Sequence, residues 1–227
     1  MLPEEERTIA FVDLSGFTAL TEAHGDETAT AVALRFYEIV RSLLRDGTTL
    51  VKTIGDAVML VAVDPETAIS LILELQALTD STPDFPMIRA GLHVGPAREV
   101  EGDYFGASVN LAARVAAHAS AGQVLCTAAV ATRIAECGLC TVVELGPVLF
   151  RNVHDRVVIY EVRGKHVTTP AHIDPVCRMH VTTDAAIARI RSESGEIFFC
   201  SLRCLRTFVH ERLSDDNTPG THTERTS

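Results

Sequence analysis

The stretch FVDLSGFT, residues 11–18, places a carboxylate at the tip of an apolar strand. Asp13 ends the apolar run 9–12, and the turn-forming pair Ser15-Gly16 follows at once. Burying an unpaired charge costs several kcal/mol, so the sequence must supply a partner for this carboxylate. We expect a cation, a helix that begins after Gly16, or water to meet Asp13.

The composition sets limits on the fold and on the partners. The 227 residues are 47% apolar, which predicts one large domain or a medium domain followed by a small one. The formal charge of −10 argues against a general surface for nucleic acids or anionic membranes. It leaves room for a nucleotide, because a nucleotide needs only a local site.

The N-terminal segment MLPEEERT is acidic and polar, unlike a signal peptide. No apolar run approaches the roughly 20 residues of a membrane span. We therefore expect a cytoplasmic protein without a membrane span. In that compartment the six cysteines are expected to be thiols, metal ligands or redox sensors rather than structural disulfides.

Hydrophobic periodicity and turn signals predict alternating strands and helices up to residue 162. The expected helices span 28–45, 65–79 and 107–118, and the expected strands span 8–13, 46–63 (two strands around a tight Gly55-Asp56 turn), 87–100, 123–127, 140–145 and 156–162. This order predicts an α+β sandwich with a mostly antiparallel sheet and helices on one face.

The chain changes character after residue 162. Residues 1–162 form the first predicted domain, and 163–171 read as a linker. Residues 172–213 form a small cysteine-containing unit with a helix from 201 to 213. The polar tail 214–227 has no apolar period and is predicted to be disordered.

A second carboxylate, Asp56, lies on the tight turn of IGDAVM between two apolar strands. Asp13 and Asp56 together can converge on one hard cation, since oxygen ligands suit Mg²⁺ or Mn²⁺ held with substrate phosphates. Each also has an ordinary interpretation: Asp13 as a helix cap, and Asp56 as a common turn residue.

Four motifs occur in order along the chain: FVDLSGFT, VKTIGDAVM, RAGLHVG and GDYFGASVNLAARV. Together they resemble the catalytic domain of class III nucleotidyl cyclases over residues 7–162. The segment EVEGDYFGASVN is similar to the short-arm bacterial subgroup. The resemblance implies a ferredoxin-like sandwich.

The resemblance also implies roles for particular residues. Asp13 and Asp56 match the aspartates that hold two Mg²⁺ or Mn²⁺ ions. Asn110 and Arg114 match the pair that stabilises the transition state, and their i, i+4 spacing puts both on one helix face. Alone, this pair would read as an ordinary polar stripe on an alanine-rich helix.

Two further positions match the residues that select the base. Lys52 and Asp103 correspond to the lysine and aspartate of adenylyl cyclases, a donor for adenine N1 and an acceptor for its amino group. Guanylyl cyclases carry a glutamate and a small polar or thiol residue there, so the resemblance implies ATP. Alone, these would be a solvated strand lysine and a turn residue.

The triphosphate contact of the family falls near Arg151, in LFRNVHD, where a lysine followed by glycine is commoner. Arg89 is a second possible phosphate contact, although a structural strand arginine is equally compatible. His93, in GLHVG, is interpreted as a core or surface histidine, and the Cys137/Cys140 pair as structural.

The resemblance implies an adenylyl cyclase that converts ATP to 3′,5′-cyclic AMP and pyrophosphate. In the family one subunit supplies the metal aspartates and its partner supplies the other four residues. This chain carries all six, which implies a homodimer with two complementary sites. The alternatives are an inactive cyclase-fold binding module and a metal-handling protein.

The C-terminal run DPVCRMH … IFFCSLRCLRTF resembles a YHS domain, a small metal-associated module related to the TRASH type. Its cysteines are Cys177, Cys200 and Cys204. His180 is the expected fourth ligand, and a Cys₃His set suits zinc or a softer thiophilic metal. Such a unit would modulate the cyclase. The alternative is a small apolar unit whose thiols are core residues.

Overall fold

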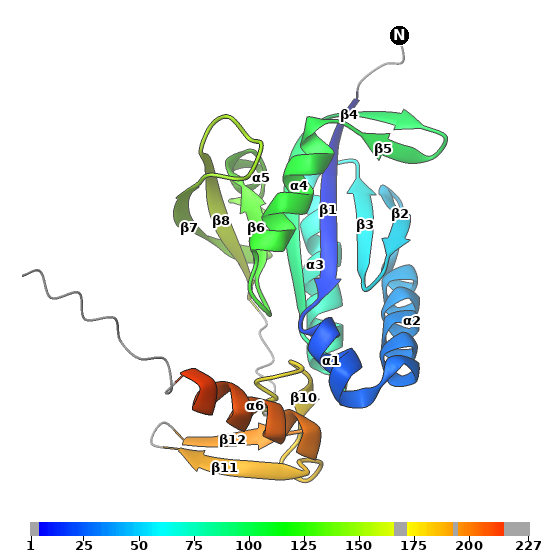
Figure 1. The fold of residues 1–227 in the computed structure, drawn as a ribbon. Coiled ribbons are helices and arrows are strands. Elements are labelled where there is room, and N and C mark those ends of the chain that lie inside the picture. Colours follow the sequence, from blue (N-terminus) through cyan, green and yellow to red (C-terminus); the bar gives the residue numbers. More distant parts are fainter. Residues whose placement is uncertain (1–4, 166–171, 193–194, 216–227) are drawn as a thin grey trace, which may run out of the picture.

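The computed structural model describes residues 5–165, 172–192 and 195–215 (Figure 1). A large sheet with helices occupies the first part of the chain, and a small unit lies below one end of it. Most of the predicted linker (166–171) and most of the predicted disordered tail (216–227) lie outside the described residues.

The large sheet has the strand order β2-β3-β1-β4-β6-β8-β7, and β5 pairs with β4. Its strands are β1 (Glu5–Leu14), β2 (Thr48–Ile54), β3 (Ala57–Ala62), β4 (Ile88–Val100), β5 (Asp103–Phe105), β6 (Val124–Thr127), β7 (Cys140–Val148) and β8 (Val157–Gly164). Only the β4–β6 pair of this sheet is parallel. The predicted α+β class with a mostly antiparallel sheet is confirmed.

The helices of this part are α1 (Phe17–His24), α2 (Asp26–Leu43), α3 (Pro65–Asp80), α4 (Ala107–His118) and α5 (Ala128–Ile134). The expected helix 107–118 agrees with α4 at both ends. Two elements, β5 and α5, are absent from the sequence prediction and have three and seven residues. The eight-residue α1 was expected only as one of three alternative partners of Asp13. Such short segments show too few repeats for a periodic pattern to stand out.

Helices cover both faces of the sheet, so the prediction of helices on one face is wrong. Ala10 and Val12 of β1 join the core that includes α2, α3 and α5. Ile9 faces the other way and packs in a second cluster with Ala112 of α4. Figure 1 shows α4 in front of the sheet and α3 behind it. The physical reason is that central strands with apolar residues on both faces need cover on both.

The close approach of α4 depends on Gly91 of β4. A Cβ atom added there would lie 2.0 Å from the backbone nitrogen of Ala116. The helix backbone therefore rests directly on the strand, and no other residue fits at this position.

The C-terminal unit contains β9 (His172–Ile173), β10 (His180–Val181), β11 (Ala188–Ser192), β12 (Gly195–Phe199) and α6 (Leu202–Asp215). Its backbone bonds to the first part of the chain: the amide of His180 donates to Phe85 O at 3.0 Å, and the amide of Met87 donates to Arg178 O at 3.0 Å. Cys177 and Phe199 join the same apolar core as the helices α2 and α3. The unit is thus packed against the first part of the chain.

Among the described residues, no helix combines the length and the apolar character that crossing a membrane requires.

Candidate active site and cysteine cluster

Asp13 and Asp56 meet at the end of the central strands. Asp13 lies opposite Ala57 of β3 and Arg89 of β4 in the sheet register. Asp56 occupies the turn between β2 and β3, and the amide of Leu14 donates to its carbonyl oxygen at 3.3 Å. The predicted pair of carboxylates is therefore brought together by strand pairing.

The electrostatics of this pair favour a divalent cation. Burial, followed by the negative charge of Asp13, raises the pKa of Asp56 to about 6. The guanidinium of Arg89 partly offsets this, and its Nε donates to Asp13 Oδ2 at 2.8 Å. The single positive charge of Arg89 faces two carboxylates, so this group of three side chains keeps a net negative charge when both carboxylates are ionised. Oxygen donors with excess negative charge fit Mg²⁺ or Mn²⁺.

Lys52 and Asp103 also meet. The ammonium of Lys52 on β2 lies 2.7 and 2.6 Å from the two carboxylate oxygens of Asp103, the first residue of β5. The hydrogen bond from Lys52 is the main cause that lowers the pKa of Asp103. Both side chains remain partly exposed. The two residues expected to select the base thus form one donor–acceptor pair within a single chain.

Asn110 and Arg114 lie on α4, over the sheet face toward which Asp13 points. Asn110 is exposed and Arg114 is half-buried. Ala116 rests on Gly91, which pairs with Phe11, two residues before Asp13. With rises of about 1.5 Å per helix residue and 3.3 Å per strand residue, Asn110 lies on the order of 15 Å from Asp13. Asn110 and Asp13 therefore lie at different levels of the sheet and do not meet within one chain.

Arg151 lies exposed in the turn between β7 and β8. His93 is half-buried, with Nδ1 2.9 Å from the hydroxyl of Thr127. The sulfurs of Cys137 and Cys140 are 3.9 Å apart.

A cavity of about 350 Å³ opens between α3 and the end of β8, and its lining contains none of the predicted site residues.

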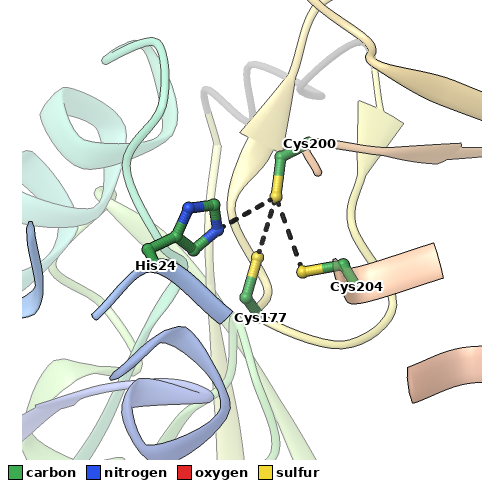
Figure 2. Close-up of side chains that lie close together, drawn as sticks. All are labelled: His24, Cys177, Cys200 and Cys204. Carbon is green, nitrogen blue, oxygen red and sulfur yellow. Dashed lines mark hydrogen bonds between the residues drawn. The ribbon is translucent and has the colours of Figure 1, made fainter. Parts of the chain in front are cut away.

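A second site forms where the C-terminal unit meets α1. Cys177, Cys200 and Cys204 lie together, as predicted, but their fourth neighbour is His24, the last residue of α1 (Figure 2). His180 does not lie in this cluster. It is buried and faces Asp80 of α3, with Nε2 3.4 Å from Oδ1.

The replacement of His180 by His24 has a physical reason. His180 lies on β10, whose backbone bonds to Phe85 and directs its side chain toward the end of α3. His24 is more than 150 residues before the first of these cysteines, and no spacing rule connects it to them. The sequence held no signal that could have found it.

Arg178, directly after Cys177, has a backbone φ of 61°. This left-handed conformation favours glycine and strains an arginine slightly. The turn is nevertheless formed, with the amide of Arg178 donating to Asp174 O at 3.0 Å. The strained residue thus lies in a formed turn beside Cys177.

The first part of the chain is similar to known proteins. Residues 1–164 match the adenylate and guanylate cyclase catalytic domain. The chain therefore belongs to the adenylate and guanylate cyclase family. A stretch of 118 residues is 42% identical to the pH-sensitive adenylate cyclase MT1302 of Mycobacterium tuberculosis, covering 52% of this chain and 30% of that protein. An adenylate cyclase of Streptomyces griseus is 33% identical over 131 residues, covering 57% of this chain and 33% of that protein.

The aligned part spans about a third of the length of these curated relatives. Among solved structures, an adenylate cyclase of Trypanosoma brucei, described in its monomeric state, superposes with a TM-score of 0.63 at 29% identity. That match covers 70% of this chain and 90% of the other. The adenylyl cyclase CyaB of P. aeruginosa has a TM-score of 0.64 at 22% identity, covering 73% and 97%, and supports the fold alone.

Proposed function

We propose that this chain is an adenylyl cyclase, which converts ATP to 3′,5′-cyclic AMP and pyrophosphate at sites shared between two copies. The observation that carries the proposal is the convergence of Asp13 and Asp56 beside Arg89 on the face of the sheet that α4 covers. The relatives named as adenylate cyclases support the choice of reaction.

Asp13 and Asp56 would hold two Mg²⁺ or Mn²⁺ ions, and their proximity and oxygen donors fit that role. When bound, such ions activate the ribose 3′-hydroxyl and stabilise the pyrophosphate leaving group. Arg89 pairs with Asp13 in the free chain. Its guanidinium becomes available to a substrate phosphate when cations take over the carboxylates.

The Lys52–Asp103 pair supports adenine as the base. The ammonium is a donor for adenine N1, and the carboxylate is an acceptor for the exocyclic amino group. The 2.6 Å ion pair holds both groups side by side before substrate arrives. Arg151 is proposed as a contact to the triphosphate, since its exposed guanidinium can bind phosphate oxygens.

A homodimer completes the site. Asn110 and Arg114 would act on the nucleotide held by the partner's aspartates, binding the ribose and the charge that develops on the transferred phosphoryl group. Exposed apolar side chains lie near other proposed site residues: Phe105 beside Lys52, and Ile54 before the Asp56 turn. Such side chains are expected at a subunit interface.

The C-terminal unit is proposed to be a YHS-like domain that modulates the cyclase. Its three cysteines converge, and its backbone contacts the segments that flank Asp13. We infer that its state is passed to the active site through those contacts.

The test is cyclic nucleotide production by the purified chain with ATP or GTP and with Mn²⁺ or Mg²⁺, beside Asp56→Ala. We expect cyclic AMP from ATP with the unchanged chain and none with Asp56→Ala. Cyclic GMP as the main product would overturn the choice of base. A confirmed dimer without any product would favour a cyclase fold that only binds nucleotide.

A further inference from the structure

Four side chains of the metal-binding kind lie within one small volume at the junction of α1 and the C-terminal unit (Figure 2). The sulfur of Cys200 is 3.3 Å from that of Cys177, 3.7 Å from that of Cys204 and 3.3 Å from His24 Nε2. A tetrahedral zinc ion, with bonds of about 2.3 Å to sulfur and 2.0 Å to nitrogen, separates its ligands by roughly 3.5–3.8 Å. The observed spacing is close to that of one shared ion.

The sulfurs are separate thiols. A disulfide needs a sulfur–sulfur distance of about 2.05 Å, and all three cysteines are free. Cys177 and Cys204 are fully buried, whereas Cys200 and His24 are partly exposed. An ion can therefore reach the cluster from solvent on the side of Cys200 and His24. Three thiolates and an imidazole select a thiophilic ion, in contrast to the oxygen ligands of Asp13 and Asp56.

A buried carboxylate organises the loops that carry two of these cysteines. Asp174 is 0% exposed and accepts backbone hydrogen bonds from Val176 at 2.8 Å, Cys177 at 3.3 Å and Cys200 at 2.9 Å. The hydroxyl of Ser201 accepts from the amide of Cys204 at 3.1 Å. These bonds hold the cysteines in position independently of any ion, as the groups behind metal ligands usually do.

We propose that His24, Cys177, Cys200 and Cys204 bind one zinc ion, or a similar thiophilic ion. This ion links the C-terminal unit to α1, the helix that follows the Asp13 loop (residues 13–16). His24 ends α1, and α1 begins at Phe17, four residues after Asp13. The ion thus binds the C-terminal end of α1, and the N-terminal end of α1 follows the Asp13 loop.

The near end of the same helix touches the C-terminal unit as well. A Cβ atom on Gly16 would lie 3.1 Å from the carbonyl carbon and oxygen of Cys177. The carbonyl of Arg178 accepts from Met87 N at 3.0 Å, and the carbonyl of Met87 accepts from Ser15 N at 2.8 Å. A ligand loop of the ion is therefore joined to the loop of Asp13 by two backbone hydrogen bonds, with Met87 between them.

It follows that the ion restrains the loop that positions Asp13. This consequence rests on the proposed cyclase function, whereas the ion site itself does not. We expect the ion-loaded chain to produce cyclic AMP about fivefold faster than the ion-free chain, a coupling of ordinary size between two sites.

The site is tested by titrating the reduced, metal-free full chain with Co²⁺, whose visible absorption is intense in tetrahedral thiolate sites, followed by displacement with Zn²⁺. We expect this absorption to saturate at one thiolate-bound ion per chain. His24→Gln should weaken cobalt binding at least about tenfold. Cys200→Ser should bind cobalt less tightly than His24→Gln does. His180→Gln and Cys137→Ser are matched controls and should bind like the unchanged chain.

Two results would overturn the site: no tetrahedral cobalt spectrum from the unchanged chain, or weakening by His180→Gln without weakening by His24→Gln. Hydrogen exchange of the unchanged chain gives a reading that needs no variant. Zinc should protect the amides of residues 14–24, and an unchanged exchange rate there would contradict the link to α1.

Cyclase rates with and without zinc separate the two proposals. A cobalt site with equal cyclic AMP rates would refute the regulation and leave the ion site standing. If neither form makes cyclic nucleotide, the proposed function fails, while the cobalt spectrum still decides the ion site.

Discussion

The imidazole of His24 lies 3.3 Å from the sulfur of Cys200, a residue 176 positions later in the chain. His24 belongs to the helix that follows Asp13, a residue proposed to hold the catalytic metal ions, and Cys200 belongs to the C-terminal unit. The contact therefore joins the two parts of the chain next to the loop on which catalysis is proposed to depend.

Replacement of Asp56 by asparagine should stabilise the metal-free protein. Folding raises the pKa of this carboxyl from 3.8 to about 6, so the folded chain binds more protons than the unfolded chain in that window. The contribution of the protonated Asp56 carboxyl to the free energy of unfolding is complete below pH 3.8. It is lost as the pH rises through about 6. The full shift corresponds to about 3 kcal/mol, but the group is half-exposed, so we expect about 1 kcal/mol.

Urea unfolding with a chelator, between pH 4 and 8, measures this effect. The gain of Asp56→Asn over the unchanged chain should appear above pH 6 and vanish near pH 4. Asp46→Asn, at an exposed carboxylate, is the control and should show no such dependence. A gain that is equal at all pH values would rule out the burial of this carboxylate and its repulsion with Asp13 as the cause.

Two inactive variants should restore activity when mixed. Asp56→Ala removes a metal ligand, and Asn110→Ala removes a group proposed to act on the partner's nucleotide. Random pairing makes half of the dimers mixed, and each mixed dimer has one intact site of two, which predicts about a quarter of the unchanged rate. A mixture that stays inactive, with mixed dimers confirmed by mass spectrometry, would mean that each chain builds its own site.

Lys52→Ala should lower kcat/KM for ATP by about 10- to 100-fold, since a hydrogen bond to a charged group contributes about 1.5–3 kcal/mol. The partly exposed pair with Asp103 should contribute less than about 1 kcal/mol to stability, so the variant should remain folded. Arg45→Ala breaks a comparable exposed ion pair with Glu74 and is the control. Equal losses in both variants would argue against a role for Lys52 in base recognition.

Gly91→Ala should destabilise the chain by about 3 kcal/mol and reduce activity. The added methyl would lie 2.0 Å from Ala116 N, so α4, with Asn110 and Arg114, must move away from the sheet. Gly164→Ala in β8 is the control, since its methyl would be 3.4 Å from the nearest atom. Thermal unfolding of both variants measures the difference, and similar melting temperatures would contradict the close contact.

Much of the fold could be predicted from local patterns. Apolar residues repeat often enough to reveal the helix at 107–118 and the long strand that carries Arg89. The Gly55-Asp56 turn is recognised from its turn-forming residues. The cover on both faces of the sheet was not predicted. Whether α4 lies on the same side as α3 depends on which face each strand residue takes, and short buried strands that are apolar on both faces do not encode that.

The sequence by itself determined the chemistry of the site residues: the carboxylates Asp13 and Asp56, the Lys52 and Asp103 pair, and the three cysteines. Their identities and short spacings are local properties, readable without a fold. Only the tertiary structure decided which groups share a volume, as with Arg89 beside Asp13 on the neighbouring strand and His24 in place of His180 beside the cysteines. The reason is that such contacts depend on strand register and on the docking of distant segments, which are set by the packing of the whole chain.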